Sequence, residues 1–234
     1  MIKGGLATLI ACALAVTFAL PVHASARFVA SYHMEETSGT VAHDSSGYGN
    51  DASIYHLELG QPGYVGWGFG FKGSPSLGYV RIPASSSINP GTHDFTYRVR
   101  INIPSGTSIT HDYSLLRRGA SKSPGPFYKL ELVRRQNTGA VHAICAWRDD
   151  LGNHVSVQGG SDWNTGKWNK LACKRSGSTF SLRRNNKVLA SKTVAGMGSF
   201  SSSNPIFLGA EQIDSTHFWE LFHGTMDEVR LWKG

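Results

Sequence analysis

The clearest alternation of hydrophobic and polar positions lies at residues 94–103. Five apolar side chains, at Phe95, Tyr97, Val99, Ile101 and Ile103, alternate with Thr96, Arg98, Arg100 and Asn102. Successive side chains of a β-strand point to opposite faces, so this pattern predicts a strand that buries one face. The other face, which carries Arg98 and Arg100, is expected to meet solvent.

A second alternation closes the chain at residues 222–232. Val229 and Leu231 point one way along an extended backbone, whereas Glu228, Arg230 and Trp232 point the other way. A strand at the end of a chain needs a partner that is already in place. We therefore expect this closing strand to seal a sheet beside the first predicted strand, at residues 27–34.

Short alternations also recur between these two stretches, separated by turns rich in glycine and serine. The Asn185-Asn186 dipeptide suits a two-residue hairpin turn, because asparagine tolerates positive φ. Few segments have helical periodicity. The pattern predicts an all-β sandwich or barrel of about a dozen strands. The predicted strands are 27–34, 63–73, 77–83, 94–103, 113–118, 127–134, 141–148, 153–158, 166–175, 179–184, 187–192, 206–209 and 226–232.

The front of the chain has the features of a secretory signal peptide. Lys3 precedes an apolar run from Leu6 to Leu20, and small residues follow at the cleavage spacing, at Ala24 and Ala26. The run is about 15 residues long, shorter than the roughly 20 that span a bilayer. We expect residues 1–26 to be removed, residues 27–234 to be one secreted extracellular domain, and no membrane span to remain.

Cysteine usage agrees with export. Cys12 lies in the signal peptide, which leaves Cys145 and Cys173 as a pair. Both lie in predicted strands of an exported protein, so we expect a disulfide that closes a loop of about 29 residues. Two buried free thiols are the alternative.

The charge of the chain bears on its partners. The formal net charge is +7, and it falls to about +6 once Lys3 is removed with the signal peptide. A positive charge of this size attracts polyanions, or it serves solubility alone. A nucleic acid is not expected, because an exported sandwich without a recognition helix or an aromatic RNA motif lacks the usual binding elements. We expect a monomer.

Four stretches, taken in order, carry a family resemblance. They are residues 34–50 with Asp44-Ser45-Ser46-Gly47, residues 66–83 with Trp67, Phe69 and Phe71, residues 94–97, and residues 224–232. Together they resemble the LamG-like (laminin G, concanavalin A-like lectin/glucanase) jelly-roll family over nearly all of the mature chain. The resemblance implies two packed antiparallel sheets, with the closing strand beside the first.

Oxygen-bearing side chains suggest a structural calcium site. Asp44, Asn50 and Asp51 lie in a glycine-containing loop, and Asp227 opens the last strand. Pairing of the first and last strands would bring Asp44, Asn50 and Asp227 toward one edge, and Ca²⁺ prefers such oxygen ligands. The resemblance implies structural calcium near these positions. The alternative is a turn in which Asp44 accepts hydrogen bonds from backbone amides while Asp227 pairs with an arginine.

Binding of an extracellular polysaccharide or glycan, with anionic polymers among the candidates, is the function we expect. Sugar rings stack on aromatic faces, and arginine binds carboxylate or sulfate groups through paired donors. Trp163, in a polar loop, is the candidate stacking platform. The further candidate ligand-binding residues are Tyr128, Arg134 and Arg148.

Catalysis is the runner-up, as a small polysaccharide lyase or glycosidase on the same fold. A glycosidase needs two carboxyl groups about 5–10 Å apart, and no Glu-x-Asp-x-x-Glu run occurs, while Glu131 stands alone on its strand. No Gly-x-Ser-x-Gly elbow is present either. No catalytic residue is therefore assigned. A structural or adhesion protein that binds a protein partner is a third interpretation.

Overall fold

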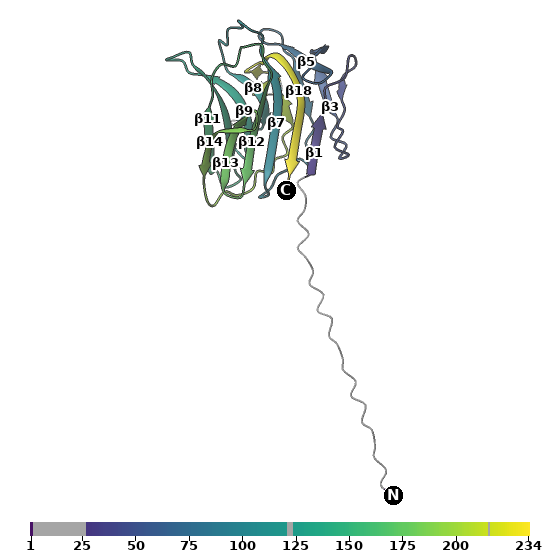
Figure 1. Cartoon of the computed structure of the whole chain (residues 1–234), viewed down its shortest axis with the longest axis vertical. Coiled ribbons are helices and arrows are strands. Elements are labelled where there is room, and N and C mark those ends of the chain that lie inside the picture. The colour runs from purple at the N-terminus through teal and green to yellow at the C-terminus, as the bar shows by residue number, and fades with distance from the viewer. Residues whose placement is uncertain (2–26, 121–123, 215) are drawn as a thin grey trace.

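The two ends of the mature domain pair with each other. In a computed structural model, which describes Met1 and residues 27–120, 124–214 and 216–234, strand β1 (Arg27–Tyr32) runs antiparallel to β18 (His223–Lys233). Phe28 lies opposite Trp232, and Tyr32 lies opposite Val229. This confirms the pairing expected from the sequence (Figure 1). The predicted signal peptide lies outside the described residues, apart from Met1.

The described residues form two antiparallel sheets and contain no helix. One layer, called sheet A here, carries β1 and β18 at the front of Figure 1. The order of its strands is β14 (Lys187–Thr193), β13 (Thr179–Arg184), β12 (Asn169–Ser176), β7 (Phe95–Asn102), β18, β5 (Trp67–Lys72) and β4 (Glu58–Pro62), with β1 also paired to β18. Strand β18 contacts β5 along its first half and β1 along its second half, and it joins both to β7.

Sheet B is the second layer. The order of its strands is β11 (His154–Gly159), β10 (Val141–Arg148), β9 (Phe127–Arg134), β8 (Tyr113–Arg118), β15 (Ile206–Leu208), β6 (Tyr79–Ile82), β3 (Ala52–Tyr55) and β2 (Val41–Ala42). A separate hairpin of β16 (Glu211–Gln212) and β17 (Phe218–Trp219) completes eighteen strands in the described part of the chain. The sequence suggested about a dozen; the additional strands are mainly short pieces of two to five residues without a readable alternation.

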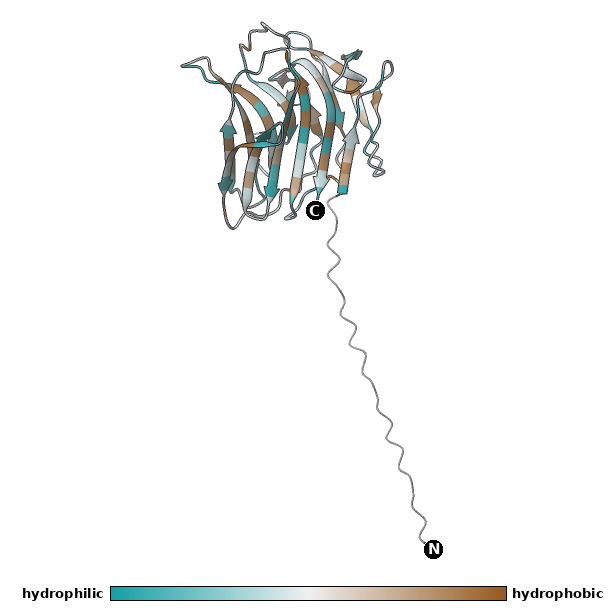
Figure 2. Cartoon of the chain, viewed as in Figure 1, coloured by the Kyte–Doolittle hydropathy of each residue, from teal (hydrophilic) through white to brown (hydrophobic). Residues whose placement is uncertain are grey.

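The core lies between the two sheets, where the brown segments of the strands alternate with teal in Figure 2. Tyr97, Val99 and Ile101 of β7 are fully buried, as the alternation predicts. Cys145 of β10 and Cys173 of β12 form the expected disulfide, with Cα atoms 5.7 Å apart. Because β10 belongs to sheet B and β12 to sheet A, this bond ties the two layers together.

Two local conformations shape the sheet that carries the candidate site. Asn185 and Asn186 adopt φ values of 49° and 73° and close the β13–β14 hairpin, as their sequence predicts. Strand β18 contains a bulge between Asp227 and Arg230, and Glu228 within it has φ 52°. A bulge places two consecutive side chains opposite one residue of the neighbouring strand. Asp227 and Glu228 therefore both lie on the outer side, while Met226 and Val229 stay buried.

No helix in the described ranges is long and apolar enough to cross a bilayer.

Candidate functional site

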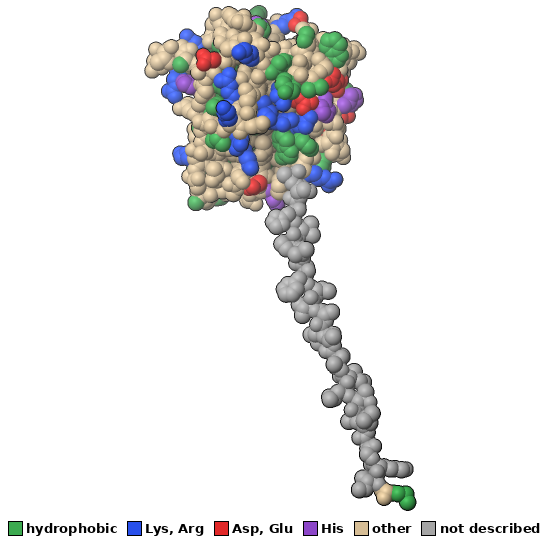
Figure 3. Space-filling view, viewed as in Figure 1, with side chains coloured by type: hydrophobic (Ala, Val, Ile, Leu, Met, Phe, Trp, Pro, Cys, Tyr) green, Lys and Arg blue, Asp and Glu red, His purple; other side chains and the backbone are tan. Residues whose placement is uncertain are grey.

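Cationic side chains gather on the outer face of sheet A. The strand register places Lys170 of β12 opposite Arg100 of β7, and Arg230 of β18 opposite Arg98. We call the set Arg98, Arg100, Lys170, Lys174, Arg183 and Arg230 the basic face. Figure 3, viewed as in Figure 1, shows Lys and Arg side chains over the middle of this layer. The outward-facing Arg98 and Arg100 of β7 thus form one row of a larger cationic cluster.

Aromatic rings lie directly under three of these cations. The Cζ atom of Arg100 is 3.5 Å from the ring centroid of Tyr64, and that of Arg98 is 4.9 Å from Trp232. Arg230 lies over Phe28 at 5.1 Å, and the Phe28 and Trp232 rings are 4.7 Å apart. These cation–π contacts hold the guanidinium groups in place on a partly apolar floor.

One carboxylate balances the centre of this face within the described residues. Glu228 lies 2.5 Å from Arg230, 3.6 Å from Arg98 and 2.6 Å from His33 Nδ1. The bulge at Glu228 brings its carboxylate to the outer side, where it meets all three groups. Glu228 and the buried Asp227, which lies opposite Arg100, are outnumbered by the six cations of the basic face, so the face keeps an excess of positive charge.

That excess changes the acid–base properties of the cluster. Burial, followed by the nearby charges of Arg230 and Arg100, lowers the pKa of Arg98 to about 10. Burial and the same kind of repulsion, from Arg98 and Arg100, lower the pKa of Lys170. The Nε atoms of Arg98, Arg100 and Arg230 have no hydrogen-bond partner among the described residues. These Nε atoms are themselves buried, whereas the side chains of Arg98 and Arg230 are 16% and 22% exposed. An external anion at this exposed surface would relieve the mutual repulsion of the cations.

A groove crosses the basic face. A depression of about 330 Å³ is lined by Arg98, Lys170, Lys174 and Arg183 together with Trp232. A second depression of about 500 Å³ adjoins it and shares Thr96, Lys174 and Trp232 with it. The pair forms one groove along Trp232, with cations on its walls and an indole at its middle. Such a groove can hold an extended chain of sugar rings that carries anionic groups.

The three predicted calcium ligands do not form one donor set. Both carboxylate oxygens of Asp44 accept hydrogen bonds, from the amides of Ser31, Ser46 and Asn50 and from the Ser46 hydroxyl. The Asn50 side chain donates to the Val29 carbonyl. Asp44 therefore has the turn-capping role that the sequence left as the alternative, and calcium stays a prediction that no observation here supports.

Asp227 binds the backbone of the loop that contains Tyr64 and Val65. Its Oδ2 atom accepts hydrogen bonds from the amides of Tyr64 and Val65, not from an arginine. Burial raises the pKa of Asp227, although these amide bonds act in the opposite direction. No group of three or more His, Cys, Asp or Glu side chains suited to a metal ion occurs in residues 27–120, 124–214 and 216–234.

Two of the predicted ligand-binding residues are core residues in this structure. Tyr128 is fully buried and lies 5.0 Å from the Tyr97 ring, centroid to centroid. Trp163 is 1% exposed, donates from Nε1 to the Val141 carbonyl and lies beneath the Arg184 guanidinium at 4.4 Å. The expectation that Trp163 offers a ring face to a ligand is therefore wrong, and the buried Tyr128 is not accessible to a ligand either. The polar sequence of the loop suggested that Trp163 is exposed, but the loop folds this side chain back against the sandwich.

The two predicted arginines lie apart from each other and from the basic face. Arg148 donates from Nε to the Gly125 carbonyl and stacks on Phe127 at 4.7 Å. Arg134, at the end of β9, lines a pocket with Trp219 and Glu220. The structure thus does not assemble Trp163, Tyr128, Arg134 and Arg148 into one site.

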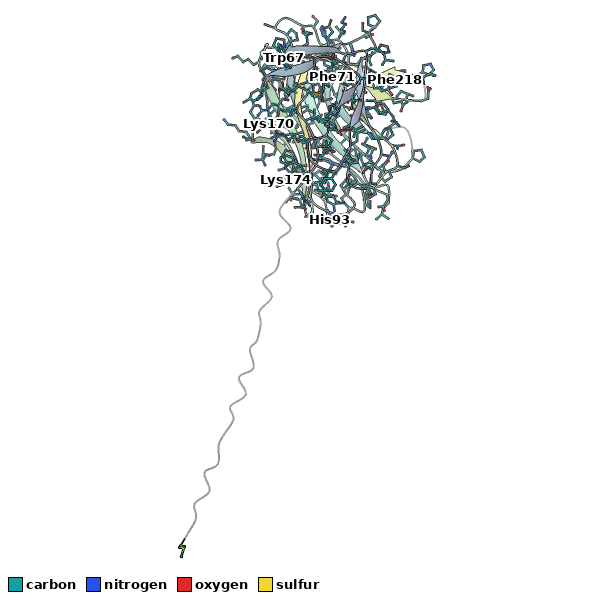
Figure 4. The ribbon with its side chains drawn as sticks, turned by 90° about the vertical axis from the view of Figure 1, so that its right-hand side faces the viewer. Trp67, Phe71, His93, Lys170, Lys174 and Phe218 are labelled. Atoms are coloured by element: carbon teal, nitrogen blue, oxygen red, sulfur yellow. A yellow bond between two sulfur atoms is a disulfide. The ribbon has the colours of Figure 1, made fainter. Side chains whose placement is uncertain are left out.

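Sheet B carries a buried charge cluster on its outer side, beneath the β16–β17 hairpin. Arg117 forms ion pairs with Glu131, with Glu211 at 2.9 Å and with Glu220 at 3.1 Å. Lys129 contacts Glu131 at 2.5 Å, and the Glu131 side chain is 1% exposed. These carboxylates bind cations of the protein and do not form an open pair across a sugar-binding cleft. Figure 4 places Lys170 and Lys174 on one side of the sandwich and Phe218 of the hairpin on the other.

The residues that sequence reasoning missed are the aromatic floor of the basic face. Trp232 and Tyr64 were not assigned a ligand role, and neither was Phe28. The alternation at residues 228–232 already pointed Trp232 outward with Arg230. Its alignment with Arg98 depends on the register between β18 and β7, which no local pattern reveals.

The chain resembles known proteins in sequence and in fold. Residues 74–234 match the Laminin_G_3 family model, described as the concanavalin A-like lectin/glucanases superfamily. No curated protein matches the sequence. Among solved structures, domain 4 of AbnA, an extracellular arabinanase of Geobacillus stearothermophilus in complex with arabinotriose, has a TM-score of 0.59 and 18% identity over 89% of this chain and 93% of that one.

Toxin binding domains are also similar in fold. The binding domain of Paraclostridial Mosquitocidal Protein 1 has a TM-score of 0.65 and 14% identity, over 88% of this chain and 49% of that one. The binding domain of Botulinum Neurotoxin DC in complex with SialylT has a TM-score of 0.66 and 12% identity, over 88% and 47%. The chain spans about half the length of these toxin domains, and at these identities the likeness concerns the fold.

Proposed function

This chain belongs to the concanavalin A-like lectin/glucanases superfamily, and we propose that it is a secreted, non-catalytic module that binds a carbohydrate or another extracellular polymer of anionic character. The basic face is the proposed site. The single observation that carries this proposal is the alignment of Arg98, Arg100 and Arg230 over aromatic rings, with Glu228 as the central counter-charge.

The chemistry of the groove matches a charged polysaccharide. Guanidinium groups bind carboxylate and sulfate groups through paired donors, while the half-buried Trp232 adds apolar surface beside them. The arabinotriose complex of the arabinanase domain and the SialylT complex of the toxin domain support carbohydrate binding on this fold. Fold likeness alone does not assign a ligand, so the proposal depends on the residues of the basic face.

Export fits the same proposal. The Cys145–Cys173 bond is of the kind that persists in oxidising compartments. Sequencing of the mature N-terminus tests the expected cleavage after Ala24 or Ala26. A mature protein that starts at Met1 would contradict export by a cleaved signal peptide.

The test uses dextran sulfate and polygalacturonate as anionic probes and dextran as the neutral control. We expect binding to both polyanions that weakens as salt concentration rises, because salt screens exposed charges. Lys170, Lys174 and Arg183 are changed together to glutamine, and binding is expected to fall at least about tenfold, or 1.4 kcal/mol. The matched control changes Lys187, Lys192 and Arg135 to glutamine, which removes the same charge elsewhere.

The outcomes separate the alternatives. Equal loss in both triple variants would contradict a specific basic face. Release of unsaturated, ultraviolet-absorbing ends from polygalacturonate would make the protein a lyase, and the non-catalytic part of the proposal would fail. Retention of a protein partner that soluble polyanions do not displace would favour an adhesion role.

A further inference from the structure

A pocket at the rim of the sandwich has a different chemical character from the basic face. Its volume is about 560 Å³, and we call it the rim pocket. It lies where β8 begins and β9 ends, below the segment that leads from β17 into β18. The residues that matter here are His111, Asp112, Arg134, Gln136, Trp219 and Glu220. This volume is within the range of small-molecule sites.

Trp219 is the exposed aromatic group of the rim pocket. This residue is 60% exposed, whereas Phe218 beside it packs against Tyr79 with ring centroids 4.6 Å apart. Phe218 also contacts Phe207, at 5.9 Å. Trp219 pairs with Glu211 across the hairpin, and more than half of its surface is open to solvent. The hairpin thus holds a large flat ring at the mouth of the pocket.

Polar groups line the wall across from this ring. Asp112 Oδ1 accepts a hydrogen bond from the Arg134 amide at 2.7 Å, which fixes the carboxylate at the rim. His111 Nε2 lies 3.2 Å from the Leu221 carbonyl. The side chains of Arg134 and Gln136 make no hydrogen bond to any described residue. The wall therefore offers both donors and acceptors, the combination that sugar hydroxyl groups require.

The net charge of this wall is close to zero. The positive charge of Arg134 is matched by the negative charge of Asp112. Burial and the neighbouring Glu131 carboxylate raise the pKa of Glu220 to about 9. Arg117 Nη1 also donates to the Glu220 carboxyl group at 3.1 Å, so Glu220 adds no unpaired negative charge to the wall. The rim pocket therefore has little net charge, whereas the basic face is strongly positive.

We propose that the rim pocket is a second binding site, for a neutral sugar unit stacked on Trp219 and hydrogen-bonded by Asp112, Arg134 and Gln136. This goes beyond the function proposed above, because the ligand class and the residues both differ. A polymer chain on sheet A and a neutral sugar at the rim would then be bound by the same domain at once.

The test titrates the full mature domain with cellotriose, xylotriose, mannotriose and maltotriose by calorimetry, at high salt so that the basic face is screened. We expect at least one neutral trisaccharide to bind. Trp219→Ala and Gln136→Ala should each weaken that binding at least fivefold. Gln136 lies in an exposed turn, so its replacement tests the site without disturbing the hairpin.

Trp67→Ala is the matched control, since Trp67 is 46% exposed and does not line the rim pocket. This variant should keep the affinity of the unmodified domain. Absence of binding by all four trisaccharides would overturn the proposal. So would binding that survives both Trp219→Ala and Gln136→Ala. Binding of dextran sulfate is measured in parallel, so failure at the rim is distinguished from failure of the basic face.

Discussion

Asp227 holds the loop that places the Tyr64 ring against Arg100. The Oδ2 atom of this buried carboxylate accepts hydrogen bonds from the amides of Tyr64 at 2.8 Å and of Val65 at 3.0 Å. The Tyr64 ring then lies 3.5 Å from the Arg100 guanidinium carbon. A residue that the sequence suggested as a calcium ligand therefore positions an aromatic ring of the basic face.

The first prediction concerns this contact. Asp227→Ala leaves two amides without their acceptor, and we expect a loss of about 1–3 kcal/mol in the free energy of unfolding, measured in urea. Affinity for dextran sulfate should fall as well, because Tyr64 is released. Tyr64→Ala is the control: the residue is 48% exposed, so this change should reduce affinity with little loss of stability. Unchanged stability of Asp227→Ala would refute the role given to this carboxylate.

Glu220 gives a prediction on pH. Its pKa of about 9 in the folded protein lies above the ordinary value of 4.5. The folded protein holds a proton that the unfolded chain releases, so this contribution to stability is complete below about pH 4.5 and is lost as pH rises through about 9. We expect the melting temperature to decline across this range, and Glu220→Gln, which mimics the neutral acid, to flatten the decline.

Glu58→Gln is the control variant for Glu220→Gln. Glu58 is exposed and pairs with Lys72 at 3.0 Å, so its replacement should leave the pH dependence as it is. Thermal unfolding at several pH values measures both variants. If Glu220→Gln kept the full decline, the raised pKa of Glu220 would not be its source.

The disulfide gives a third prediction. The cysteines are 28 residues apart in sequence, and loss of such a bond costs about 3–4 kcal/mol in the chain-entropy model. We expect the Cys145→Ala and Cys173→Ala double variant to unfold at lower urea concentration by this amount. Intact mass before and after reduction should differ by two hydrogen atoms. An unchanged mass would show that the thiols are free.

Asp44 gives a fourth prediction, on the turn that follows β1. Asp44→Ala removes the acceptor for the amides of Ser31, Ser46 and Asn50, so we expect a loss of about 1–3 kcal/mol in the free energy of unfolding. Chelation with EDTA is the informative comparison. A melting temperature that EDTA lowers in the unmodified protein but not in Asp44→Asn would show that calcium binds there, contrary to the hydrogen bonds seen.

Local pattern predicted the parts of the fold that depend on local physics. The alternation in β7 fixed which side chains are buried, and Asn185-Asn186 marked a hairpin because both residues adopt positive φ. The pairing of β1 with β18 followed from the need of a terminal strand for a partner. In each case a short stretch of sequence determines the outcome.

The candidate site was harder to predict because it depends on register and on covering layers. Both faces of β9 carry buried residues, because Arg117 pairs with Glu131 on its outer side and Arg148 stacks on Phe127. Alternation therefore did not reveal that Tyr128 points inward. Trp163 lies in a polar loop, yet Arg184 covers its ring. The rows of the basic face combine residues from β7, β12, β13 and β18 that are far apart in sequence.

The most direct test of the central claim follows the arginine Nε–H resonances by nuclear magnetic resonance during titration with oligogalacturonate and with short dextran sulfate. The Nε atoms of Arg98, Arg100 and Arg230 are buried and have no protein partner. Because an anion bound at the basic face would change the electrostatic environment of these groups, we predict that their signals and the Trp232 indole signal shift on binding. Shifts confined to residues outside the basic face, or no shift with either probe, would contradict the account.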